Sequence, residues 1–178
     1  STADDGDRQV TGVRVLHKVS GEEQTLDADL VVDATGRSGR ATVLLPQLGY
    51  DPPAEERLEV DIKYVSRNYR LPPGRVAPTK VVIVGAQPGR PTGLTFLEHA
   101  DDRWMLTLIG YGGHHPPTDP DAFLEFAGRL LPPPVFAAVR EAEPLDQPVA
   151  HRFPASTRRR YEWLSRFPDG LLVFGDAI

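Results

Sequence analysis

The strongest constraint on the fold comes from two short apolar runs that stand near opposite ends of the chain. The segment ADLVVDATGRSGR covers residues 28–40, and the segment FPDGLLVFGDAI covers residues 167–178. In each, a run of Leu and Val leads directly into a turn that contains Gly. Such unbroken apolar runs are typical of strands that are covered on both faces in a parallel sheet. We therefore expect both strands to need parallel neighbours, and we expect the rest of this chain not to supply them.

Between these runs, the sequence predicts an antiparallel sheet. Residues 10–19 and 24–36 predict a β-hairpin, because they flank a turn that contains Gly. From residue 58 onward apolar and polar residues alternate, as a half-buried strand requires. The expected apolar face of that strand carries Leu58, Val60, Ile62 and Tyr64. Further strands are predicted at residues 80–86, 93–99 and 103–111, and their short connections favour antiparallel pairing.

Helices follow the predicted sheet. Asp119 has the position of an N-cap before Pro120, and the apolar residues up to Leu131 recur at helical spacing. Prolines at 132–134 end this helix, and residues 135–143 predict a second one. The order of hairpin, sheet, helices and final strand predicts an α+β fold.

Charge and composition exclude several classes of function. The net charge of -5 would repel a nucleic-acid backbone, so we expect no nucleic-acid partner. The run Arg158–Arg160 is interpreted as a solvated strand face. The sequence contains no cysteine, which favours the reducing cytoplasm as the compartment. No run approaches the length of about 20 apolar residues that spans a membrane, and the first residues, STADDGDRQ, carry acids where a signal peptide carries bases.

The common catalytic motifs are missing. GRSGR at 36–40 lacks one residue of a nucleophile elbow, and none of the three lysines follows a phosphate-binding glycine loop. His114 and His115 are adjacent, so in a strand they would point to opposite sides and could not share a metal. The paired aspartates are interpreted as turn and cap residues. We therefore predict no catalytic side chain and no metal site, and we expect a cofactor to carry the chemistry.

The two apolar runs, taken in this order and about 140 residues apart, resemble part of a known family. They are similar to the later part of FAD-dependent monooxygenases with the para-hydroxybenzoate hydroxylase fold, most of all the bacterial epoxidase-like and hydroxylase-like branch. The resemblance implies an internal fragment that lacks N-terminal and C-terminal parts of its own chain and is inactive by itself. It also implies three regions: residues 1–50 and 156–178 from an incomplete Rossmann-like FAD-binding domain, and residues 51–155 as an antiparallel substrate domain.

The same resemblance implies the cofactor contacts. Gly175 would let the backbone approach the flavin, and Asp176 would accept hydrogen bonds near the ribityl chain. Ala177 completes this second motif, and the first motif contributes Asp33, Gly36 and Arg37. Many hydroxylases of this fold have Asp-Gly in the first motif, whereas this chain has Thr35-Gly36 with Asp33 two residues earlier. Turn formation is the alternative explanation for both motifs, because Gly and Asp favour turns in any fold.

By the resemblance, the sheet between the motifs forms the substrate site. Alternation assigns to the cavity-facing side Leu94, Phe96, Trp104, Leu106 and Leu108, although large aromatics are also typical core residues. NAD(P)H would reduce the flavin, and a C4a-hydroperoxide formed with O2 would transfer one oxygen to an aromatic ring or an alkene of a small hydrophobic substrate. Two alternatives remain open: a flavin-dependent reductase or halogenase on the same scaffold, and a cofactor-free binding module.

Overall fold

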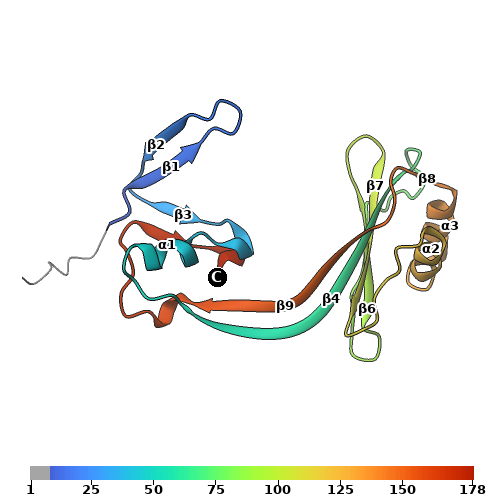
Figure 1. The fold of residues 1–178 in the computed structure, drawn as a ribbon. Helices are drawn as coiled ribbons and strands as arrows, with labels where there is room; N and C mark the ends of the chain where they lie inside the picture. The colour runs from blue at the N-terminus through green and yellow to red at the C-terminus, as the bar shows by residue number, and fades with distance from the viewer. Residues whose placement is uncertain (1–8) are drawn as a thin grey trace, which may run out of the picture. The chain divides into compact units, whose positions relative to one another are not determined.

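The computed structural model describes residues 9–178, and the acidic residues before Gln9 lie outside the described part. The predicted α+β class is confirmed. The chain divides into two compact units (Figure 1). The first consists of the residues up to Arg57 together with Thr157–Ile178, and the second is Leu58–Ser156. Strands β4 (Ala54–Arg70) and β9 (Val149–Arg160) pair with each other and belong in part to each unit.

The first unit begins with the predicted hairpin. Strands β1 (Gly12–Leu16) and β2 (Glu23–Asp27) pair antiparallel, with Leu16 opposite Glu23 beside the turn. A short helix that the sequence analysis did not identify, α1, follows the first motif and spans Ala41–Gln47. The remaining helical pieces are single 3₁₀ turns: η1 (Gly36–Ser38), η2 (Tyr161–Trp163) and η3 (Gly175–Ala177).

The two apolar runs at the ends of the chain pair with each other. Strand β3 (Val31–Asp33) lies parallel to β10 (Leu171–Val173), with Leu171 opposite Val31. The expectation that the chain supplies no parallel neighbour for these strands was wrong, because each strand supplies the neighbour of the other. On one face of this pair, Leu171 and Val173 of β10 form a small buried cluster with Ala41 and Ala177. Parallel pairing of strands this far apart in sequence cannot be recognised from either run alone.

The second unit is built on a six-stranded sheet with the strand order β5-β6-β7-β4-β8, in which β9 also pairs with β4. The added strands are β5 (Val81–Val84), β6 (Thr92–Glu98), β7 (Arg103–Tyr111) and the two-residue β8 (Glu143–Pro144). Strands β5 to β7 form an antiparallel meander, as their short connections predicted. Strand β4 then pairs antiparallel with β7, with Tyr64 opposite Ile109.

Two helices cover one face of this sheet (Figure 1). Helix α2 (Pro120–Gly128) is capped by Asp119, whose carboxylate accepts a hydrogen bond from the Ala122 N–H at 3.0 Å. Helix α3 (Pro133–Glu141) begins with two prolines, which suit a first helical turn because it needs no N–H donors. Both predicted helices are confirmed. No helix within residues 9–178 combines the length and apolarity needed to cross a membrane.

The core face of β4 differs from the predicted one. Of the predicted face, Ile62 is buried outside the main core cluster, Leu58 is exposed and Tyr64 is half-buried. The β4 side chains that enter the main cluster are Val65 and Tyr69 on the opposite face. The alternation from Leu58 to Tyr64 therefore distinguished the two faces of β4 but did not identify the face that the helices cover. That choice depends on where α2 and α3 pack, which a single strand does not encode.

Candidate functional site

The two sequence motifs meet at the carboxyl ends of the parallel strands β3 and β10. Val173 lies opposite Asp33 in the strand register, and the Phe174 N–H donates to the Asp33 carbonyl at 3.0 Å. Immediately beyond this pair, each strand turns into a 3₁₀ helix, and η1 contacts η3. The carboxyl ends of parallel strands are where α/β sheets bind ligands. The candidate site is therefore this corner of the first unit.

Both strands leave the sheet through a glycine with a left-handed backbone. The φ angle is 74° at Gly36 and 67° at Gly175, values that other residues adopt only with strain. Apart from the residues directly before and after each glycine, a Cβ atom built on either one would have no heavy atom of the described chain within 4 Å. The backbone at both corners is therefore open on the side where a side chain would point, and a ligand could approach it there.

The carboxylate of Asp33 holds the loop at the first corner through hydrogen bonds. Asp33 is 6% exposed, and its Oδ1 accepts hydrogen bonds from the Thr35 hydroxyl at 2.5 Å and the Thr35 N–H at 3.1 Å. Its Oδ2 accepts from the Ala41 N–H at 2.7 Å, where α1 begins. Burial by itself would raise the pKa of Asp33, but the hydrogen bonds, first that of the Thr35 side chain, together lower it. Both carboxylate oxygens are thus engaged in holding the loop.

The other motif residues differ in accessibility. Asp176 is exposed, and its carboxylate has no hydrogen-bond partner within residues 9–178. Arg37 is also exposed, whereas Ala177 is completely buried. A Cβ built on Gly39 would lie 3.4 Å from both the Cβ and the carbonyl oxygen of Ala177, so the two motifs approach each other closely. The corner therefore presents Asp176 outward and packs Ala177 inward.

The arginine run at 158–160 differs from its interpretation as a solvated strand face. Only Arg158 has the expected exposed side chain, at 58%. The Arg159 side chain is 14% exposed; its Nη2 donates to the Arg37 carbonyl at 3.0 Å and its Nη1 to the Ala177 carbonyl at 3.2 Å. Alternation along the strand separates Arg158 from Arg159. Arg160 is covered for another reason, because it pairs with Glu56 and Glu162 at the strand end.

The five residues predicted to face a substrate cavity are core residues in the structure. Each is at most 4% exposed and lies in the cluster beneath α2 and α3: Leu94, Phe96, Trp104, Leu106 and Leu108. Phe96 and Trp104 stack with their ring centroids 4.6 Å apart. The helices occupy the side where the sequence analysis placed a cavity. Alternation identified residues that share a face, but it could not tell a helix-covered face from an open one.

The opposite face of this sheet carries no helix (Figure 1). In the strand register, Ser66 on β4, Thr107 on β7 and Thr95 on β6 form a row, and the first two hydroxyls are 2.8 Å apart. The flanking half-buried or exposed side chains on this face are Tyr64, Asn68, Val81, Ile83, Leu97, Met105 and Ile109. We name these ten residues the open sheet face. None of them is Asp, Glu, His, Lys or Arg.

The histidine pair belongs to the second unit. His115 Nε2 lies 3.1 Å from Asp61 Oδ2, and Asp61 also accepts from Arg152 Nη2 at 2.8 Å. The hydrogen bond from Arg152 is the main cause that lowers the pKa of Asp61. No group of three or more His, Asp or Glu residues within residues 9–178 is arranged to hold a metal ion.

Comparison with known proteins adds a sequence relative. No family model matches the chain. Protein Rv3254 of Mycobacterium tuberculosis (strain ATCC 25618 / H37Rv) is 42% identical over 175 residues, which cover 96% of this chain. The chain spans only 37% of the length of that relative.

Solved structures share the fold at low identity. The flavin-dependent brominase Bmp2 matches 95% of this chain with a TM-score of 0.56 and 17% identity. A flavoprotein/dehydrogenase from Cytophaga hutchinsonii matches 89% of this chain with a TM-score of 0.53 and 14% identity. The enzyme 2-methyl-3-hydroxypyridine-5-carboxylic acid oxygenase matches 94% of this chain with a TM-score of 0.51 and 16% identity. The chain has a flavoprotein monooxygenase-like fold. It covers 40%, 36% and 42% of these three chains, respectively.

Proposed function

We propose that this chain is part of an FAD-dependent monooxygenase and that the corner after β3 and β10 holds the flavin cofactor. One observation carries the proposal: two parallel strands end side by side in left-handed glycines, Gly36 and Gly175, with open space beside both. Such a corner lets a flat or phosphorylated ligand reach the backbone without meeting a side chain. The similarity to flavin-dependent enzymes supports FAD as that ligand.

The residues at the corner fit a flavin nucleotide. Gly175 would admit the ligand to the backbone, and the free carboxylate of Asp176 would accept hydrogen bonds from ribityl hydroxyls. Gly36 and Arg37 would contact the cofactor from the other strand, whereas Asp33 would act indirectly, because its oxygens already bind Thr35 and Ala41. Bound flavin, reduced by NAD(P)H, would supply the reaction of O2 with an organic substrate. The chain itself contributes positioning and exclusion of water.

We propose the open sheet face, not the helix-covered face, as the surface that contacts the substrate. Its side chains are apolar or carry hydroxyl and amide groups, and none belongs to Asp, Glu, His, Lys or Arg. At the centre of this face, around Thr107, the nearest arginines on the same side are Arg70 and Arg103, four residues along the strands. A substrate carboxylate placed there would lose its hydration without gaining a cationic partner, which costs several kcal/mol by order of magnitude. An uncharged, largely apolar molecule with a hydroxyl or carbonyl near Thr107 fits this face better. Hydroxylation and epoxidation both suit such a substrate.

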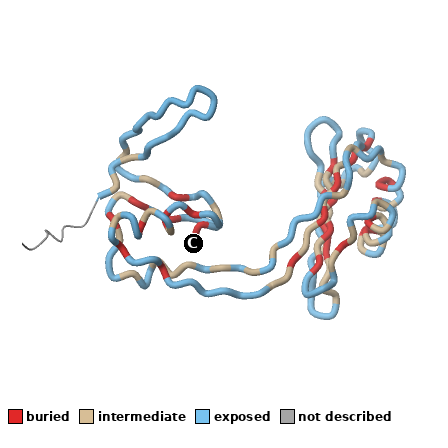
Figure 2. Tube along the Cα trace, in the orientation of Figure 1, coloured by how far each residue is buried: buried red, intermediate tan, exposed pale blue. Residues whose placement is uncertain are grey.

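We also propose that the functional protein is longer than this chain. The outer face of the parallel pair carries Val32 opposite Leu172, and both are about half exposed. Figure 2 shows that the first unit contains exposed as well as buried stretches. Phe174 beside them is 63% exposed. Parallel sheets are normally covered on both faces, so we expect a further layer of the same polypeptide here. The sequence relative, of which this chain spans 37%, is consistent with that expectation. We propose the cytoplasm as the compartment, because a cysteine-free sequence suits it.

A flavin titration of the full-length gene product tests the proposal. Yellow protein with a quenched flavin fluorescence and a defined stoichiometry is the expected result. Protein that stays colourless at saturating FAD would favour the cofactor-free binding module instead. We expect residues 1–178 alone to bind FAD weakly and to be inactive.

Variants at the corner test the placement of the cofactor. Asp176→Ala should weaken FAD binding by about 10- to 100-fold, since a hydrogen bond to a charged group contributes about 1.5–3 kcal/mol. Gly175→Ala should weaken it as well, because the left-handed backbone tolerates a side chain poorly. Gly89→Ala is the matched control, since Gly89 has a φ of 86° and open surroundings but lies in the second unit. Equal loss of affinity in both glycine variants would contradict the placement.

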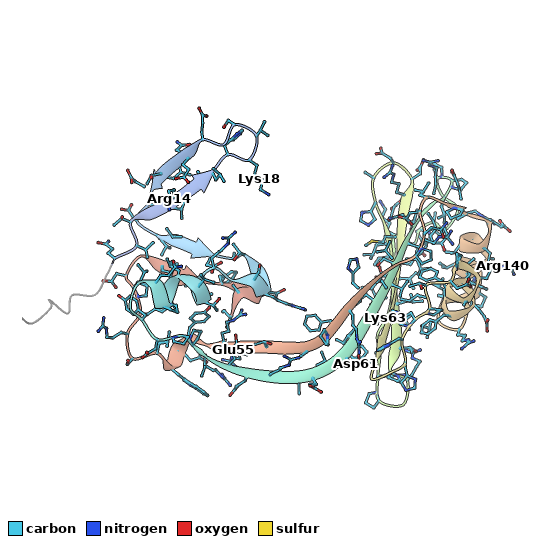
Figure 3. All side chains as sticks on the ribbon, viewed as in Figure 1. Arg14, Lys18, Glu55, Asp61, Lys63 and Arg140 are labelled. Carbon is cyan, nitrogen blue, oxygen red and sulfur yellow. The ribbon has the colours of Figure 1, made fainter. Side chains whose placement is uncertain are left out.

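A flavin-dependent halogenase is the second candidate, because the brominase Bmp2 shares the fold over 95% of this chain. Of the three lysines, Lys18 and Lys80 are exposed, and Lys63 is half-buried on β4 (Figure 3). The two reactions differ in their need for halide. Product formation that requires bromide or chloride would identify the halogenase, and oxygen insertion without halide would identify the monooxygenase.

A further inference from the structure

We propose that Arg159 is a positioning residue that fixes the spacing between the two glycine corners of the cofactor site. This inference rests on the proposed flavin site, and it adds a residue outside both sequence motifs. Arg159 is the second-to-last residue of β9, and η2 begins directly after the strand ends at Arg160. Its guanidinium bonds directly to the backbone of both motifs.

Three donors of the guanidinium reach three separate segments of the first unit. Nη2 donates to the Arg37 carbonyl in η1 at 3.0 Å, and Nη1 donates to the Ala177 carbonyl in η3 at 3.2 Å. Nε donates to Glu55 Oε1 on β4 at 3.0 Å. Arg37 directly follows the left-handed Gly36, and Ala177 lies two residues after the left-handed Gly175. A single planar group thus sets the distance between the loops that begin at Gly36 and Gly175.

The surroundings make this contact specific. The Arg159 side chain is 14% exposed, so its hydrogen bonds compete little with water. Glu55, labelled in Figure 3, holds the Nε edge and thereby fixes the plane in which the two Nη atoms point. Guanidinium groups have a rigid arrangement of donors, whereas a lysine ammonium is a single flexible point. Lysine could therefore keep the charge beside Glu55 but could not reach both carbonyls.

The contact has a consequence for ligand binding. The corner presents two open backbones, and a rigid ligand can use both only if their separation is held in advance. The backbone pairing of β3 with β10 ends at the bond from the Phe174 N–H to the Asp33 carbonyl, and beyond it Arg159 adds a side-chain connection between the two turns. Arg158, its neighbour in the sequence, makes no such connection, because it pairs with Glu162 at 2.9 Å on the surface.

Hydrogen exchange and FAD titration of the full-length gene product test the inference. The proteins are the wild type, Arg159→Met, Arg159→Lys and the matched control Arg158→Met. In the FAD-free proteins, we expect Arg159→Met to speed amide exchange in both loops, residues 34–40 and 174–178. FAD affinity should fall by roughly 2- to 10-fold, because loops that Arg159 no longer holds must be ordered when the ligand binds. Arg159→Lys should show the same two-loop effect at smaller size, and Arg158→Met should match the wild type.

The outcomes separate this inference from the proposed function. Unchanged exchange in both loops, faster exchange in one loop only, or equal changes in Arg158→Met would overturn the role of Arg159. Faster exchange in both loops with wild-type FAD affinity would overturn it too. If Arg159→Met does not fold, Arg159→Lys is judged by the same criteria. A wild type that binds no FAD contradicts the proposed function, while the exchange experiment still decides whether Arg159 joins the loops.

Discussion

The two units of this chain are stabilised in different ways. The core cluster of the second unit contains fourteen buried residues, among them Phe96, Trp104 and Phe123, packed between a sheet and two helices. The corresponding cluster of the first unit contains four buried residues within the described part of the chain. Because hydrophobic stabilisation scales with the apolar area that is buried, the second unit has far more of it.

The first unit compensates with polar contacts to the backbone. Asp33 holds Thr35 and the start of α1, and Arg159 holds the carbonyls of Arg37 and Ala177. Such contacts fix geometry but contribute less net stability than a large core, since each replaces hydrogen bonds to water. The second unit is thus stabilised mainly by its core, whereas the geometry of the first depends on polar contacts. A ligand at the proposed site would stabilise the first unit further.

The largest effect is expected in the core of the second unit. Phe123→Ala should lower the free energy of unfolding by about 3–5 kcal/mol, because a fully buried aromatic side chain leaves a cavity. Urea unfolding followed by Trp104 fluorescence measures it, in a Trp163→Phe background that removes the exposed second tryptophan. Ile83→Ala, at a 69% exposed position of the same sheet, is the control and should cost about 0.5 kcal/mol or less. A similar cost for both variants would contradict the assignment of the core.

An intermediate effect is expected at Asp33. Asp33→Asn should cost about 1.5–3 kcal/mol at pH 7, because an amide has one acceptor oxygen where the carboxylate uses two. Hydrogen exchange of residues 31–47 should locate the loss in the first unit. Asp176→Asn, at an exposed carboxylate with no partner within residues 9–178, should leave stability unchanged.

The effect at Asp33 should also depend on pH. The pKa of Asp33 is lowered in the folded chain, so its carboxylate stabilises the fold above the unfolded value of about 3.9. This contribution disappears as the pH falls through the lower folded pKa. The difference in unfolding free energy between wild type and Asp33→Asn should therefore shrink from pH 7 to pH 3. A difference that grows toward low pH would contradict the hydrogen-bonding arrangement.

The smallest effect is expected at Asp61, a surface residue of the second unit (Figure 3). Its pKa is lowered mainly by the hydrogen bond from Arg152, so Asp61→Asn removes a stabilising charge at neutral pH. Exposed ion pairs contribute little and are screened by salt. Because Asn tolerates the φ of 39° at this position, the variant isolates the charge. The variant should melt at a slightly lower temperature than the wild type. This difference should disappear in 1 M salt, where the Debye length is about 3 Å. Glu59→Gln on the same strand should show no such difference.

Much of the fold could be predicted from the sequence because it depends on local patterns. The hairpin, the meander from β5 to β7 and the helix capped by Asp119 follow from turn residues, alternation and capping, which act within a few residues. The motif glycines at 36 and 175 were also recognised, because glycine is favoured where a strand turns, and both have a positive φ in the structure. Helix α1 was missed, since its cap comes from Asp33, eight residues before Ala41.

The sequence by itself determined most elements of this protein, though not α1, together with their α+β order and the two glycine motifs. Only the tertiary structure decided which strands meet, which sheet face the helices cover and which arginine of 158–160 turns inward. The physical reason is that periodicity distinguishes two faces of a strand but does not say what lies against either. That choice arises from packing between segments far apart in sequence, as when Arg159 joins the carbonyls of Arg37 and Ala177.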